Sequence, residues 1–164
     1  MKSITFLGAS SDIVTGSSYI VTHSNGTRTM IDMGMFQGDE KTDSLNYKPL
    51  IFDPKRVQNI LLTHAHLDHV GRLPMMVKHG FRGNIYMTAP TKALAEVVLL
   101  DSAKIALNEH TKPVLYNEQD VYDTIDRIKV IHYDEVFQVN GTSICYKDAG
   151  HILGSASISM WGEN

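Results

Sequence analysis

Three histidines and one aspartate stand close together in the segment Thr63-His64-Ala65-His66-Leu67-Asp68-His69. Neutral imidazole and carboxylate are both good ligands for Zn²⁺. Side chains alternate along an extended backbone, so His64 and His66 point to the same side and can bind one metal ion together. Asp68 and His69 follow where the chain begins to turn, and they can reach a second ion. Two ions about 3.5–4 Å apart would stabilise an attacking oxygen and the developing phosphate charge.

Two further residues complete the expected centre. His151 lies between Gly150 and Gly154 at a strand-to-loop junction, where glycine permits close approach of the backbone. It is the best candidate for a third protein ligand of the ion that His64 and His66 would bind. Asp32 ends a hydrophobic strand and would be costly to bury without a partner. Because metal-bound histidines usually donate their second N–H to a carboxylate, we expect Asp32 to orient one of them.

The elements that must position these residues follow from the apolar patterns. Strands, then helices, then strands predict an α/β (α+β) fold with a mixed sheet flanked by helices. A long loop is expected over residues 35–55. Expected strands are 4–7, 18–22, 27–32, 59–63, 85–87, 130–132, 136–139, 142–147 and 155–161. Expected helices are 71–79, a helix from Thr88 or Thr91 to about Asn108, and 118–128.

Two local features sharpen this expectation. Asn25-Gly26 and Asn140-Gly141 each lie between strand-like runs, and the first is a strong signal for a type I′ hairpin turn. In the long helix, five apolar residues predict a broad buried face: Leu94, Val97, Val98, Ile105 and Leu107.

Composition limits the class of protein. The chain has 164 residues, 43% hydrophobic and 20% charged, which is typical of one globular domain. No apolar run approaches the roughly 18–20 residues of a membrane helix, and no signal peptide is recognisable, so a cytoplasmic protein is expected. The single cysteine, Cys145, is expected to be buried. The net charge of −3 gives no support to broad electrostatic binding of nucleic acid.

These motifs together resemble the metallo-β-lactamase superfamily. His64-x-His66-x-Asp68-His69 is similar to its metal motif, Asp32 to its first aspartate and His151 to its third-motif histidine. The segments around Thr15-Gly16-Ser17, Asp32-Met33-Gly34, Gly71-Arg72-Leu73-Pro74 and Gly150-His151 resemble the β-CASP branch. More narrowly, they resemble prokaryotic relatives of the mRNA 3′-end-processing endonuclease.

The resemblance implies an αββα sandwich and two zinc ions that serve hydrolysis of a phosphodiester. His64, His66 and His151 would hold the first zinc, whereas Asp68 and His69 would hold the second. Asp68 would also help to handle the proton. RNA rather than DNA is the implied substrate, with endonuclease or 5′-exonuclease activity in RNA processing. A homo-oligomer stays open.

The sequence departs from the family pattern at its end. The aspartate that bridges both metals, the β-CASP insertion and the final metal histidine are absent from residues 1–164. We therefore expect the chain to be the N-terminal part of a metallo-β-lactamase-like domain. It should bind one zinc well and a second poorly, and the fragment itself can be inactive.

Two other functions stay open. A small-molecule hydrolase, such as a thioesterase or lactamase, would share the histidine motif, but Val70-Gly71-Arg72-Leu73-Pro74 favours the nucleic-acid branch over it. A non-catalytic scaffold module of an RNA-processing complex would be expected to lack metal ligands. Every ligand that this length of chain can hold is present, which favours an enzyme.

Overall fold

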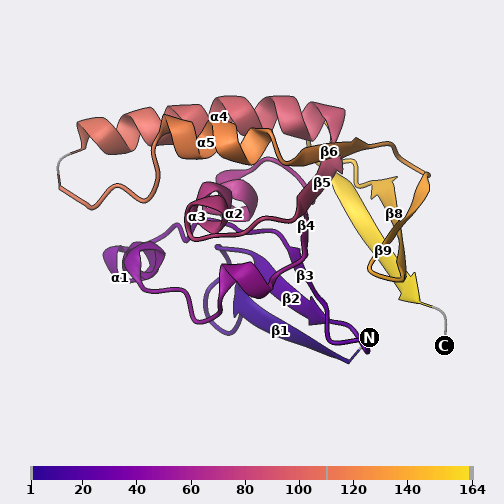
Figure 1. Cartoon of the computed structure of the whole chain (residues 1–164). Coiled ribbons are helices and arrows are strands. Elements are labelled where there is room, and N and C mark those ends of the chain that lie inside the picture. The colour runs from indigo at the N-terminus through magenta and orange to yellow at the C-terminus, as the bar shows by residue number, and fades with distance from the viewer. Residues whose placement is uncertain (1, 110, 163–164) are drawn as a thin grey trace.

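The computed structural model describes residues 2–109 and 111–162 (Figure 1). The strands are β1 (Ser3–Gly8), β2 (Ser18–Thr22), β3 (Arg28–Ile31), β4 (Asn59–Leu61), β5 (Asn84–Thr88), β6 (Ile128–Ile131), β7 (Val136–Val139), β8 (Thr142–Asp148) and β9 (Ala156–Gly162). The α-helices are α1 (Glu40–Asp43), α2 (Leu67–Val70), α3 (Leu73–Lys78), α4 (Ala89–Asn108) and α5 (Glu118–Ile125). Short 3₁₀ turns cover Ser44–Tyr47 and Pro54–Arg56.

The larger sheet is mixed and has the order β1-β2-β3-β4-β5-β6. Its first three strands are antiparallel, and β3 to β6 run parallel. Strand β4 lies inside the sheet, and all three of its residues, Asn59, Ile60 and Leu61, are buried because both of its faces are covered. Ile60 packs into the core under the helices, and Leu61 packs into a second core on the opposite face.

The smaller sheet has the order β7-β8-β9 and supplies that second core. Its buried Tyr146 donates a hydrogen bond to the carbonyl of Tyr86 at 3.1 Å, which ties β8 to β5. Cys145 is buried as expected. Helices therefore cover one face of the larger sheet and the smaller sheet covers the other (Figure 1), which confirms the expected α/β fold with a mixed sheet.

Several expected boundaries were wrong. The strand expected over 59–63 ends at Leu61, the strand expected over 130–132 begins at Ile128, and the short helix α2 was not expected. Residues 35–55 are not a plain loop, because Asp39 caps α1 by accepting a hydrogen bond from the Thr42 N–H. The third helix stops at Ile125, and Ile128 already belongs to β6. The helix ends early because Ile128 is already part of the sheet, where it lies opposite Ile85 in the parallel pairing of β6 with β5.

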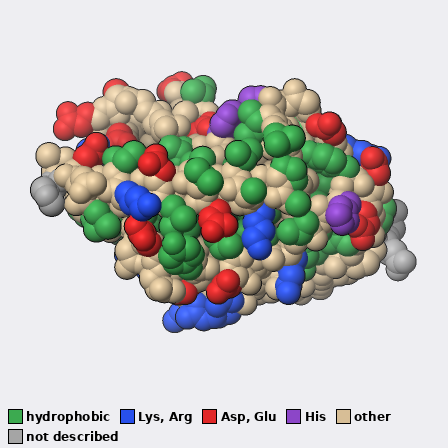
Figure 2. Space-filling view, turned by 90° about the horizontal axis from the view of Figure 1, so that it is seen from above, with side chains coloured by type: hydrophobic (Ala, Val, Ile, Leu, Met, Phe, Trp, Pro, Cys, Tyr) green, Lys and Arg blue, Asp and Glu red, His purple; other side chains and the backbone are tan. Residues whose placement is uncertain are grey.

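The buried face of α4 also differs from the expectation. Thr88 caps the helix as predicted, but its buried positions are Thr91, Ala95, Leu99 and Ala103. Val97 is 66% exposed. The apolar residues of α4 itself are spread over all sides of the helix, so the apolar pattern alone predicted the wrong buried face. Figure 2, which views the molecule from the side of α4 and α5, shows apolar side chains interspersed with charged ones.

The two Asn-Gly turns differ as well. Asn140 and Gly141 both have positive φ, at 52° and 80°, as a type I′ turn requires. At the first turn Gly26 has a φ of 84°, but Asn25 is not among the described residues with positive φ, so the type I′ expectation is wrong there. The Asn25 side chain instead accepts hydrogen bonds from the N–H and hydroxyl of Thr27.

Within the described ranges, no helix combines the length and the apolar character that crossing a bilayer requires.

Candidate metal centre

The centre is built where β4 ends. The segment after β3 packs main chain against main chain on the short helix α2: Met33 N–H donates to the His69 carbonyl and Met35 N–H to the Leu67 carbonyl. A Cβ atom on Gly34 would lie 1.6 Å from the carbonyl oxygen of Asp68. Only glycine can occupy that position without moving α2, so the Asp-Met-Gly sequence fixes the distance between Asp32 and the histidine motif.

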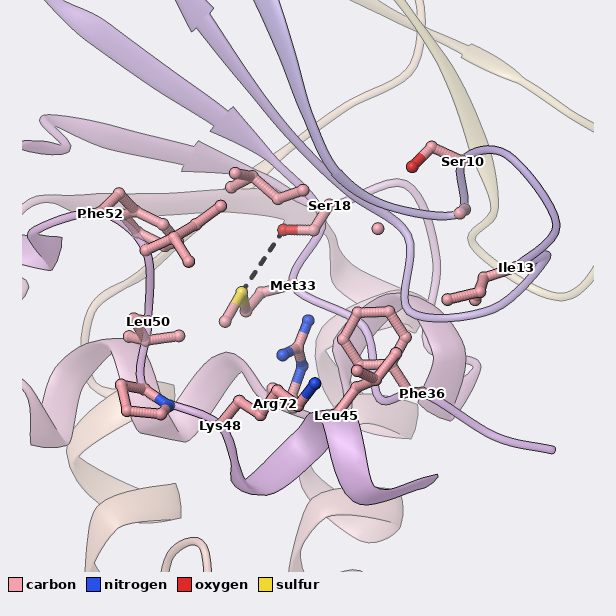
Figure 3. A pocket seen from close by; sticks show the side chains of 15 residues that line it. Ser10, Ile13, Ser18, Met33, Phe36, Leu45, Lys48, Leu50, Phe52 and Arg72 are labelled. Atoms are coloured by element: carbon pink, nitrogen blue, oxygen red, sulfur yellow. Dashed lines mark hydrogen bonds between the residues drawn. The ribbon is translucent and has the colours of Figure 1, made fainter. Parts of the chain in front are cut away.

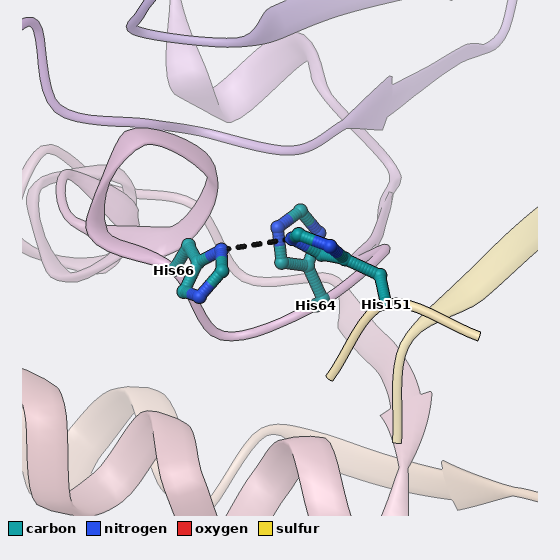
Figure 4. Close-up of side chains that lie close together, drawn as sticks. All are labelled: His64, His66 and His151. Atoms are coloured by element: carbon teal, nitrogen blue, oxygen red, sulfur yellow. Dashed lines mark hydrogen bonds between the residues drawn. The ribbon is translucent and has the colours of Figure 1, made fainter. Parts of the chain in front are cut away.

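Three histidines converge at this edge of the sheet (Figure 4). The ligand atoms of His64, His66 and His151 all lie within 4.8 Å of one another. The Nε2 atom of His151 is 3.1 Å from the Nδ1 atom of His66. His64 is buried, whereas His66 and His151 are exposed, so the cluster opens to solvent on one side.

The loop that carries His151 is held from two directions. Ser155 is buried, and its hydroxyl accepts hydrogen bonds from the N–H groups of His151 and Ile152. The next residue, Ala156, donates its N–H to the Thr63 carbonyl at 2.9 Å. The start of β9 is thereby joined to the residue that precedes His64, which brings His151 to the other two histidines.

Asp32 and Thr63 form a buried polar link beneath the histidines. Asp32 is 1% exposed and accepts the backbone N–H of Thr63 on Oδ1 and the Thr63 hydroxyl on Oδ2, each at 2.8 Å. His69 Nδ1 lies 2.8 Å from the same Oδ2 atom. The Thr63 hydroxyl is also 2.9 Å from His64 Nδ1. Thus one carboxylate and one hydroxyl orient two imidazole rings.

The electrostatics suit a cation. Burial lowers the pKa of His64 to about 4, helped by the positive charges that His69, His66 and His151 would carry, so His64 keeps a neutral, metal-binding form. Burial alone would lower the pKa of His69, but its hydrogen bond to Asp32 and the charges of Asp32 and Asp68 raise it. Burial raises the pKa of Asp32, against the hydrogen bonds from His69 and Thr63.

These hydrogen bonds decide which nitrogen each ring offers. A carboxylate only accepts, so His69 Nδ1 donates its proton to Asp32. The Thr63 hydroxyl donates to Asp32, so it accepts from His64 Nδ1. The Nε2 atoms of both rings are left with free lone pairs. Nδ1 of His66 and Nε2 of His151 also face each other, and they need a shared proton or a cation between them. These ring nitrogens form a donor set that fits a metal ion.

A protein-family model supports this view: the metallo-β-lactamase superfamily domain matches residues 20–161. The chain belongs to the metallo-β-lactamase superfamily. The resemblance inferred from the motifs is therefore confirmed at the level of the superfamily.

Several relatives of the chain are proteins named for a function in RNA processing or transcription. The chain is 40% identical over 150 residues to a ribonuclease from Thermus thermophilus, covering 92% of this chain and 33% of that protein. It is 36% identical to cleavage and polyadenylation specificity factor 73 of Drosophila melanogaster, covering 92% and 22%. It is 33% identical to the transcription termination factor FttA of Methanosarcina mazei, covering 93% and 24%. The chain thus spans a third or less of the length of these relatives.

Solved structures agree on the fold. A subclass B3 metallo-β-lactamase from a soil metagenome library superimposes with a TM-score of 0.56 at 16% identity, covering 92% of this chain and 53% of that chain. A β-lactamase from Chitinophaga pinensis gives a TM-score of 0.56 at 20% identity, covering 92% and 52%. At such identities the likeness concerns the fold alone.

The expected second metal position of this superfamily domain has fewer donors. His69 Nε2 and Asp68 Oδ2 lie 3.6 Å apart and are about a quarter exposed. Within the described ranges, the three-histidine cluster is the only group of three or more potential ligands. Beside both positions lies an open cavity of about 590 Å³, whose lining includes His66, Asp68, Val98, Asp101 and Ile105.

Two residues that organise the site were not assigned this role from the sequence. Thr63 joins Asp32 to His64, and Ser155 holds the loop of His151. A threonine directly before the first motif histidine was a local signal for the former. The role of Ser155 depends on a loop conformation that the sequence pattern did not reveal.

Proposed function

We propose that this chain provides the metal-binding part of a zinc-dependent phosphodiester hydrolase that acts on RNA. The observation that carries the proposal is the convergence of His64, His66 and His151 next to the Asp68–His69 pair. The curated relatives named as a ribonuclease and a cleavage factor support RNA as the substrate class. Because the chain covers at most a third of them, activity of the whole protein is part of the proposal.

In this proposal His64, His66 and His151 hold the first zinc, and Asp68 and His69 contribute to a second. Bound zinc would supply Lewis acidity, which polarises a phosphoryl oxygen and acidifies water. Asp32 acts as a positioning residue, since it fixes the tautomer of His69 and, through Thr63, that of His64. Asp68 is partly exposed and lines the open cavity, so the carboxylate oxygen that does not face His69, Oδ1, would accept the proton of the attacking water.

The neighbouring cavity would accept a negatively charged substrate only if metal cations are bound beside it. Asp68 and Asp101 line it, and no lysine or arginine is among its lining residues. A phosphate group there would need the charge of metal ions for compensation. Its apolar lining from Val98 and Ile105 offers surface for the flat face of a base.

The first experiment measures zinc content per chain by elemental analysis of protein purified without chelators or a histidine tag. About one zinc per chain, lost in His151→Ala, is expected. His132→Ala is the matched control, because His132 is an exposed histidine outside the cluster. Zinc content that is unchanged by His151→Ala would contradict the proposed first site.

The second experiment separates substrate classes. Wild-type chain and His66→Ala are incubated with a fluorescently labelled RNA oligonucleotide, a thioester and a β-lactam. RNA cleavage that His66→Ala abolishes supports the proposal. Turnover of the thioester or lactam without RNA cleavage would replace the nuclease with a small-molecule hydrolase.

A further inference from the structure

A second cavity lies apart from the metal centre, between the end of β1, the end of β3 and residues 45–52 (Figure 3). It measures about 230 Å³ and shares no lining residue with the candidate metal ligands. Most of its wall is apolar and comes from Leu7, Ile13, Leu45, Leu50, Ile51 and Phe52. Such a wall favours an apolar ligand or the apolar part of one.

The wall also contains polar side chains, those of Ser10, Ser18, Lys48 and Arg72. The side chain of Arg72 is almost completely buried, with the residue 5% exposed. Its Nε–H donates to the Gly34 carbonyl at 2.6 Å, and its guanidinium carbon lies 4.4 Å from the centre of the Phe36 ring. The terminal nitrogens point towards Met33 and Ser18 (Figure 3). Among the described residues, neither the hydrogen bonds nor the ion pairs include a partner for these nitrogens.

An arginine in this position is unusual on physical grounds. Buried charges are normally paired, because leaving water is costly for an ion without a counter-charge. No aspartate or glutamate lines the cavity. Burial lowers the pKa of Arg72 to about 10, which still leaves the guanidinium charged at neutral pH. The cavity is therefore lined by one buried positive charge, that of Arg72, and by the exposed Lys48, and the terminal N–H groups of Arg72 face a mostly apolar space.

We propose that this cavity binds a small monocarboxylate with an apolar tail, and that Arg72 holds its carboxylate. The planar fork of a guanidinium matches a carboxylate with two parallel hydrogen bonds. The buried cation balances the charge of a carboxylate, and the mostly apolar wall suits an apolar tail, which inorganic phosphate lacks. Lys48 also lines the cavity, and because it is exposed it adds attraction for an anion as the ligand enters.

Calorimetric titration of the 164-residue chain with octanoate tests the proposal. We expect saturable binding with a Kd on the order of 0.1–1 mM, which is ordinary for a ligand of this size. Octanol, which has the same tail without the charge, should bind about 10-fold more weakly. Methyl NMR signals of Ile13, Leu45 and Leu50 should shift with octanoate and saturate at the same Kd.

Variants locate the binding to the guanidinium. Arg72→Met should weaken octanoate binding about 10- to 100-fold, and Arg72→Lys, which keeps the charge but loses the fork, should weaken it less. Arg82→Met is the matched control, because Arg82 is an exposed arginine that also donates to backbone carbonyls but lies outside the cavity. Its affinity should equal that of the wild type.

The ligand comparison keeps the test decisive even if Arg72→Met fails to fold, because it uses only wild-type protein. Equal affinity for octanoate and octanol would overturn the role of Arg72. No saturable binding of octanoate up to about 10 mM, far above the expected Kd, would overturn the site. Competition of inorganic phosphate with octanoate at equal concentration would overturn the assignment to carboxylates.

Discussion

The three-histidine cluster and the Asp68–His69 pair are neighbours, yet they are built in different ways. The cluster gathers donors from two chain segments. His66 and His151 are separated by 85 positions in the sequence, but Nδ1 of His66 and Nε2 of His151 are only 3.1 Å apart. The pair comes from one short helix and offers two donor groups, 3.6 Å apart. The comparison indicates that convergence of two chain segments, rather than local richness in ligand residues, brings three potential ligands to one position.

The largest effect is expected from His151→Ala. Loss of a direct ligand should weaken the first zinc by more than about 100-fold, since even loss of an outer hydrogen-bond partner costs about 10- to 100-fold. Competition with a chromophoric chelator measures the affinity. His132→Ala should leave it unchanged. A loss below threefold would show that the cluster does not depend on the distant segment, and the contrast with the pair would fail.

Asp32→Asn should act most strongly on the pair, because Oδ2 of Asp32 contacts His69 directly and His64 only through the Thr63 hydroxyl. The amide nitrogen would donate to His69 Nδ1, so the proton of that ring moves to Nε2 and removes the lone pair that faces Asp68. The same amide nitrogen would face the Thr63 hydroxyl, which then loses its acceptor and can donate to His64 Nδ1, so the tautomer of His64 is no longer fixed either. The second metal should weaken about 10- to 100-fold, and the first should weaken less.

A two-step zinc titration of Asp32→Asn separates the two positions. Asp32→Ala is the comparison variant, since it removes the hydrogen bonds to Thr63 as well and should affect both steps. Equal weakening of both steps in Asp32→Asn would show that Asp32 does not distinguish the cluster from the pair.

Thr63→Val tests the other branch of the same network. Valine keeps the shape but removes the hydroxyl between Asp32 and His64, so the first zinc should weaken about 10-fold. The free energy of unfolding should fall by about 1–3 kcal/mol, because the buried carboxylate loses a donor. Chelator competition and urea unfolding measure the two effects. Thr63→Ser, which keeps the hydroxyl, should retain the wild-type affinity.

The smallest effect is a difference in protonation between His64 and His69 without metal. The pKa of His64 is lowered to about 4 and that of His69 is raised, so near pH 6.5 His64 should be neutral and His69 mostly charged. The contribution of His64 to stability is lost as pH falls from about 6.5 towards 4. That of His69 is full at low pH and is lost as pH rises through its raised pKa.

Imidazole NMR titration of the metal-free chain measures both groups directly. Asp32→Asn should abolish the upward shift of His69 and leave His64 low. Similar titration of the two rings in the wild type would mean that the buried network does not separate the cluster from the pair.

The cavity around Arg72 adds a contrast in the use of charge. At the metal centre, buried Asp32 is satisfied by Thr63 and His69, whereas the terminal nitrogens of buried Arg72 have no such partner among the described residues. The two residues are linked through the segment after β3. Arg72 Nε–H donates to the carbonyl of Gly34, and Asp32 lies two positions before Gly34 in the same segment. One position thus uses its polar partners to orient metal ligands, and the other presents free donors to a cavity.

Local sequence patterns were enough to predict the metal motif, the order of the helices and strands, and the family. The spacing of His64, His66, Asp68 and His69 after an apolar strand indicated a metal centre, because ligand chemistry and the alternation of side chains act over a few residues. The order of the elements and the mixed sheet followed from apolar periodicity in the same way. The superfamily match confirms the family, whereas the ligand roles stay predictions for the metal measurements.

Tertiary structure decided what depends on contacts between distant segments. The buried face of α4 is set by its packing against the rest of the core, since apolar residues on all sides left the helix pattern undecided. The roles of Thr63 and Ser155, and the burial of Arg72 beside an apolar cavity, also needed the folded chain. The physical reason is that a hydrogen bond or a charge is satisfied by whatever lies next to it in space, and local patterns do not specify that neighbour.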